Sequence, residues 1–126
     1  MDYDDFVNDV EDLYFIEDEE AADAAVKASL SVLVNRIPEE PARRLAEELP
    51  QQLNFEMLRG KKQQAIPPTL DQSITELSRQ FGIDKDESRE LLSTVLSVTK
   101  DAVSDETLEE LEDNLPDEWV TFIEAA

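Results

Sequence analysis

The sequence predicts an all-α fold, a helical bundle built from two tandem pseudo-equivalent repeats of three to four helices each. Apolar residues recur at helical spacing along the chain, and no alternating β-branched run bounded by turn residues favours a strand. The second half of the chain also repeats the first. Residues 4–58 align with residues 71–124, and the alignment places Leu49-Pro50 opposite Leu115-Pro116.

The 126 residues fit a single domain, which we divide into repeat one (residues 3–58), a basic linker (59–68) and repeat two (69–126). One residue is lost in repeat two before Asp84, which aligns with Asp18, so later positions of the two repeats differ by 66 in number. Halves of about 55 residues are marginal on their own. We therefore expect the two repeats to pack together.

The first helix of each repeat is predicted by apolar residues at positions i, i+3 and i+7, which share one helical face. They are Val7, Val10 and Tyr14 in repeat one, and Ile74, Leu77 and Phe81 in repeat two. Gly82 follows the repeat-two helix as a C-terminal cap.

A longer second helix follows in each repeat, from about Asp18 to Arg36 and from Asp84 to about Ala102. Both aspartates suit an N-cap, and Glu87 lies three residues after Asp84, the spacing of a capping box. The inward positions are Ala22, Ala25, Val26, Leu30 and Leu33 in the first of these helices, and Leu91, Leu92, Val95, Leu96 and Val98 in the second.

The third helix starts after a break that is marked by Pro38 and Pro41 in repeat one and by Ser104, an N-cap candidate, in repeat two. In repeat one its charged residues form an i, i+4 ladder of opposite charges. The ladder consists of Glu39, Glu40, Arg43, Arg44, Glu47 and Glu48. Repeat two has Glu109 and Glu110 in place of the arginines, which predicts repulsion along that helix.

Short terminal helices are expected after Pro50 and Pro116, because each proline ends the preceding helix and suits the start of another. The spacing places one apolar pair on a face of each terminal helix. The pairs are Leu53 with Met57, and Trp119 with Ile123.

Composition and charge exclude many classes of function. The chain has 32 Asp and Glu against 11 Lys and Arg, a net charge of −21, no His, no Cys and 2 isolated Gly. These absences exclude the usual zinc and iron–sulfur sites, nucleophiles with a histidine base, disulfides and a glycine-rich phosphate loop. The negative charge opposes binding to nucleic acid.

No apolar run approaches the roughly 20 residues of a membrane span, and the acidic N-terminus is unlike a signal peptide. We therefore expect a cytoplasmic protein that binds no membrane.

The many carboxylates do not by themselves predict an enzyme or a metal site. The stretch from Asp84 begins like a calcium loop, but Arg89 takes the place of the required glycine and Val95 that of the bidentate glutamate. A di-metal carboxylate bundle would need histidines. Nearly all the acids fall on predicted polar faces, so we expect no catalytic activity and no cofactor.

Four stretches of the chain are familiar as a set: the opening MDYDDFV, the long helix that ends near residues 36–39, ARRLAEELPQQL (42–53), and LEELEDNLPDEW (108–119). By these stretches the chain resembles the prokaryotic domain-of-unknown-function family 2267. The resemblance covers nearly the whole chain, and its motifs are helix boundaries and core positions. It implies a small helical cytoplasmic protein with no established activity, and it offers no catalytic residues to transfer.

Seven residues are candidate contacts to a partner or to an anion. They are Arg43, Arg44, Arg59, Lys61, Lys62, Trp119 and Phe122. Arginines suit anionic ligands, although the flanking glutamates offer Arg43 and Arg44 another kind of partner. Trp and Phe are favoured interface anchors, and their alternative is to pack the last helix onto the core. The linker holds three of the basic residues, so its charge opposes that of both repeats.

Two hypotheses of function follow. In the first, the chain is a non-catalytic protein–protein interaction or regulatory module whose acidic surface steers a basic protein partner, or which associates with itself. In the second, it binds a small anion or ion in a pocket between the repeats, where Arg43 or Arg44 would meet Lys61 and Lys62. A third interpretation, adaptation to high salt, explains the charge without any partner.

Overall fold

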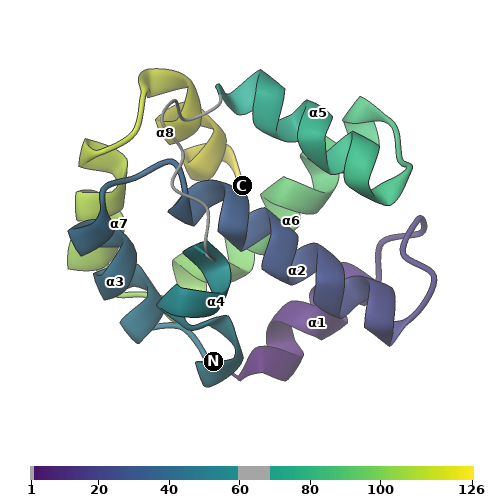
Figure 1. The fold of residues 1–126 in the computed structure, drawn as a ribbon, viewed down its shortest axis with the longest axis horizontal. Coiled ribbons are helices and arrows are strands. Elements are labelled where there is room, and N and C mark those ends of the chain that lie inside the picture. Colours follow the sequence, from purple (N-terminus) through teal and green to yellow (C-terminus); the bar gives the residue numbers. More distant parts are fainter. Residues whose placement is uncertain (1, 60–68) are drawn as a thin grey trace.

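The computed structural model describes residues 2–59 and 69–126, and every regular element in these residues is helical, which confirms the all-α prediction (Figure 1). The helices are α1 (Tyr3–Glu11), α2 (Glu19–Val34), α3 (Glu39–Glu47), α4 (Phe55–Arg59), α5 (Leu70–Phe81), α6 (Lys85–Ala102), α7 (Asp105–Asp113) and α8 (Asp117–Ala125), with a 3₁₀ helix, η1 (Gln51–Leu53).

The predicted caps set the starts of the longer helices. The carboxylate of Asp18 accepts a hydrogen bond from the Ala21 amide at 2.8 Å at the start of α2. At the start of α6, Asp84 and Glu87 each accept a hydrogen bond from the backbone amide of the other, at 2.8 and 3.0 Å. Such a capping box satisfies two amides that have no partner within the helix. Gly82 ends α5 at φ 64°, a left-handed conformation that glycine adopts without strain.

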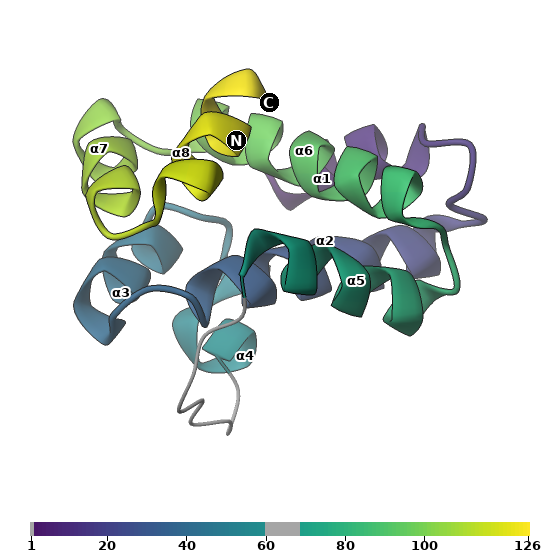
Figure 2. The ribbon, with the colours of Figure 1, turned by 90° about the horizontal axis from the view of Figure 1, so that it is seen from above.

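The helices form two layers in which the two halves of the chain are interleaved (Figure 2). One layer holds α1, α6, α7 and α8, and the other holds α2, α3, α4 and α5. Thus α1, from the first half of the chain, lies in the layer of α6, α7 and α8, and α5, from the second half, lies in the layer of α2, α3 and α4. Across the layers α1 packs on α2, α5 on α6, α2 on α6 and α3 on α7, and within them α1 packs on α6 and α5 on α2.

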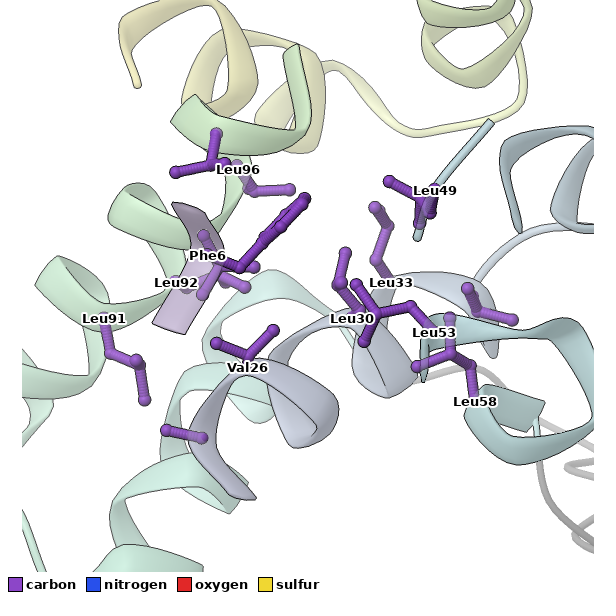
Figure 3. Close-up of a cluster of buried hydrophobic side chains, with 14 of the residues drawn as sticks. Phe6, Val26, Leu30, Leu33, Leu49, Leu53, Leu58, Leu91, Leu92 and Leu96 are labelled. Carbon is purple, nitrogen blue, oxygen red and sulfur yellow. The ribbon is translucent and has the colours of Figure 1, made fainter. Parts of the chain in front are cut away.

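The buried apolar side chains form a cluster to which both repeats contribute. In Figure 3, Leu92 and Leu96 of α6 lie beside Phe6 of α1, while Leu30 of α2 lies near Leu53. All five are almost entirely buried. Since burial of one such side chain stabilises the folded state by about 1.5–3 kcal/mol, this shared cluster holds the interleaved helices together.

Two side chains that the sequence places on apolar faces are instead exposed. Tyr14 is 80% exposed because α1 ends at Glu11, so the i, i+7 relation to Val7 is interrupted. Met57 is 41% exposed. The extended residue Asn54 separates η1 from α4 and resets the helical phase, so that Leu58, 1% exposed, is buried with Leu53 instead of Met57.

The neighbouring residues Met57 and Leu58 provide a matched test of this helical phase. We expect Leu58→Ala to lower the free energy of unfolding by about 2–5 kcal/mol, because it leaves a cavity in the core. Met57→Ala should lower the free energy of unfolding by less than about 1 kcal/mol, because truncating a half-exposed side chain removes little buried surface. Urea denaturation of both variants measures the difference, and equal losses would contradict the observed phase.

Candidate functional site

The two arginines of α3 are paired with carboxylates, as the ladder predicts. The Nε of Arg43 lies 3.0 Å from Oε2 of Glu39, and Nη2 of Arg44 lies 3.0 Å from Oε1 of Glu40. Arg43 also stacks over the ring of Phe55 at 4.2 Å. Arg44 forms a second ion pair, with Glu110 of α7, which offsets one of the negative charges of that helix. An incoming anion would have to compete with these carboxylates.

Arg59 has a structural role. Its Nη2 donates hydrogen bonds to the carbonyl oxygens of Ile37 and Val34, at 2.6 and 3.2 Å, just where α2 ends. These carbonyls have no partner within the helix, and the guanidinium also complements the negative end of the helix dipole. The predicted contacts Lys61 and Lys62 lie outside the described residues.

Of the two alternatives for Trp119, contact to a partner or packing of the last helix onto the core, the structure shows core packing. Its side chain is 0% exposed because α8 packs against α6 and buries it. Phe122, on the same helix, is partly buried, and the guanidinium of Arg89 lies 5.9 Å from its ring centre. Thus the apolar face of α8 stabilises the fold instead of offering a tryptophan to a partner.

A pocket that the sequence did not predict lies between the N-terminal ends of α1 and α2. It has a volume of about 330 Å³, and four of its six lining residues are acidic. The lining residues are Tyr3, Asp4, Val7, Glu19, Glu20 and Asp23. The acids at the start of each helix are the only sequence signal for it, and they are equally well explained by the helix dipole.

Tyr3 and Asp23 are hydrogen-bonded to each other in the wall of this pocket. The Tyr3 hydroxyl donates a hydrogen bond to Asp23, and Lys27 lies 3.1 Å from the same carboxylate. The hydrogen bond from Tyr3 is the main cause that lowers the pKa of Asp23 below its ordinary 3.8, and Lys27 adds to it. Burial, and then the bond to Asp23, raises the pKa of Tyr3 well above 10.0. Both groups therefore keep their usual charge state at neutral pH.

The rest of the pocket is negatively charged. Asp4, Glu19 and Glu20 are exposed at its surface, whereas the charge of Asp23 is offset by Lys27. The corresponding region of repeat two differs, because Glu19 and Asp23 align with Lys85 and Arg89. Asp4 and Glu20 align with Asp71 and Asp86, so two of the four pocket acids are replaced by basic residues in repeat two and two are kept as acids.

These groups have the chemistry of cation recognition. Carboxylates accept charge-assisted hydrogen bonds from ammonium and guanidinium groups, and the Tyr3 ring already has the ammonium of Lys27 5.9 Å from its centre. Within residues 2–59 and 69–126, no three acidic side chains come together as a group that could hold a metal ion.

The chain is thus small, acidic and helical in all its described regular elements, with its helices in two layers. The chain matches the family of uncharacterised conserved proteins DUF2267 over residues 3–122, and it belongs to that family. This confirms the resemblance seen in the sequence. No curated protein and no solved structure matches the chain. Across the part of the chain that the structure describes, no helix has the length and apolar character needed to cross a membrane.

The hydrogen bond between Tyr3 and Asp23 predicts a pH-dependent stability difference. Tyr3→Phe should lower the free energy of unfolding by about 1 kcal/mol at pH 7, because Asp23 loses its main donor. The folded-state pKa of Asp23 is lowered, so this contribution is present above pH 3.8 and declines as the pH falls through the folded-state pKa. The difference in the free energy of unfolding between the wild type and Tyr3→Phe should therefore become smaller at acidic pH.

Urea denaturation at several pH values measures this difference, with Tyr14→Phe as the control. Tyr14 is exposed and donates to Glu87 at 2.6 Å, so its loss should change stability little. If the difference in the free energy of unfolding between the wild type and Tyr3→Phe stays constant from neutral to acidic pH, the role assigned to Asp23 is contradicted.

Proposed function

We propose that this chain is a non-catalytic interaction module that binds a basic segment of a protein partner through the acidic pocket of repeat one. The observation that supports this most directly is the pocket itself, where exposed Asp4, Glu19 and Glu20 adjoin an aromatic ring and the apolar Val7. A lysine or arginine side chain has this same combination of an apolar stem and a cationic head.

The long-range charge of the protein supports the same kind of partner. A net charge of −21 would attract a basic segment and repel acidic ones. At physiological ionic strength the charges are screened over about 8 Å, so the choice of docking site depends on local groups. The pocket volume of about 330 Å³ accommodates a single side chain, which fits a peptide that inserts one residue.

We also propose that the chain is a tandem duplication, as the alignment of residues 4–58 with 71–124 predicts. The order of helices supports this, since α1 to α4 have counterparts in α5 to α8, and α3 and α7 have the same length of 9 residues. In this view the repeats share a scaffold, and repeat one has acquired the acidic pocket.

A short lysine-rich peptide, titrated into the isotope-labelled protein and followed by NMR, tests the proposed binding. We expect the largest chemical-shift changes at the starts of α1 and α2. The pocket variant Asp4→Asn/Glu19→Gln/Glu20→Gln should weaken binding by about tenfold, the equivalent of about 1.4 kcal/mol.

The control variant Asp86→Asn/Glu90→Gln/Asp101→Asn removes the same amount of charge from exposed positions of α6. It should weaken binding much less than the pocket variant. Equal weakening would show that net charge alone attracts the peptide, and no binding in dilute buffer would exclude the proposed basic partner. If the melting temperature also rises between dilute and molar KCl, adaptation to salt would then explain the acidity.

A further inference from the structure

The contact between α3 and α7 joins positions that are equivalent in the two repeats. From Asp18 onward the alignment offset is 66, so Arg44 in repeat one corresponds to Glu110 in repeat two. These two side chains form an ion pair with each other across the repeat boundary. A residue meets its own equivalent only where a two-fold axis relates two units.

The helix contacts have the pattern that such an axis produces. α2 packs on α6 and α3 on α7, which pairs each helix with its own counterpart. Between the repeats, the contact of α1 with α6 matches that of α5 with α2. Within the repeats, α2 with α4 matches α6 with α8, whereas α3 packs on α4 without an equally extensive contact between α7 and α8. The repeats therefore associate as the subunits of an isologous dimer do, although they are parts of one chain.

The charges near the axis distinguish the two repeats. If two copies of repeat one paired in this manner, Arg44 would face a second Arg44, and in a pair of repeat-two copies Glu110 would face a second Glu110. Only the mixed pair brings opposite charges together. Specificity of pairing commonly rests on such repulsion in the alternatives.

A second contact between α3 and α7 has the same asymmetry. The carboxylate of Glu48, at the end of α3, accepts a hydrogen bond from the Ser104 amide at 2.6 Å and another from the Thr107 hydroxyl. These bonds lower the pKa of Glu48 below its ordinary value, so the carboxylate is stabilised in its charged form at the N-terminus of α7.

The reverse contact is not available. Ser104 and Thr107 align with Pro38 and Pro41, which have neither an amide hydrogen nor a hydroxyl to donate. Asn114, which aligns with Glu48, donates to the Glu110 carbonyl of its own helix at 2.8 Å. In a pair of repeat-one copies, Glu48 would lose both donors.

We propose that the facing surfaces of α3 and α7 form a selective pairing interface whose partner is the other repeat of the same chain. Arg44 and Glu48 are the residues that specify repeat two as that partner. The proposal rests on the tandem duplication and is independent of the basic partner. The interface favours pairing of repeat one with repeat two and disfavours association between like repeats of neighbouring molecules.

Charge reversal in the full-length chain tests this pairing. Arg44→Glu removes the ion pairs with Glu110 and Glu40 and should lower the melting temperature by about 2–4 °C, whereas Glu110→Arg removes only the pair across the repeats and should lower it by less. The double variant Arg44→Glu/Glu110→Arg restores opposite charges at positions 44 and 110 and should recover the part of the loss that is due to this pair, but not the part that is due to Glu40.

The adjacent equivalent pair, Arg43 and Glu109, supplies the control. Arg43 pairs with Glu39 and Glu56, both in repeat one. The double variant Arg43→Glu/Glu109→Arg should therefore show no recovery beyond the sum of its single variants. If the melting temperature recovers in both double variants, overall charge balance is responsible. If the losses of melting temperature at positions 44 and 110 are additive, this pair does not specify the interface. Either result would overturn the proposal, whereas failure of peptide binding would leave it intact.

Discussion

The structure depends on the burial of α2 and α6, which pack against each other and are both packed by α1 and α5. These are the longest helices of the described chain, and Leu30 on α2 and Leu92 on α6 are fully buried. Because α1 packs on both α2 and α6, and α5 packs on both as well, each half of the chain contributes a helix to the core of the other half. A core shared in this manner stabilises the whole chain, whereas a half of this size would bury too little apolar surface alone.

The differences between the repeats carry the proposed functional features. Shared features are the helix starts and the buried apolar positions, which any copy of the unit needs in order to fold. The acidic pocket occurs where repeat one has Glu19 and repeat two has Lys85. The axis contact likewise combines Arg44 from one repeat with Glu110 from the other. Binding and pairing specificity are therefore expected at unlike positions of two similar units.

Sequence patterns predicted the helices well where a cap marks the boundary, as at Asp18, Asp84 and Ser104. They failed at Met57, because a short break after η1 changes the helical phase without a strong sequence signal. The pocket was not predicted because its walls come from two helices whose mutual placement depends on tertiary packing. For the same reason, the i, i+4 ladder revealed the partner of Arg44 within α3 but not its second partner in α7.

Equilibrium unfolding followed at one aromatic probe in each repeat tests most directly whether the repeats share one core. The single tryptophan, Trp119, reports on repeat two by its fluorescence. In a Tyr14→Phe variant the remaining tyrosine, Tyr3, reports on repeat one by difference absorbance. A shared core predicts a single transition with the same urea midpoint for both probes. Two separate midpoints would show that each repeat folds around a core of its own and would contradict the interleaved architecture as the source of stability.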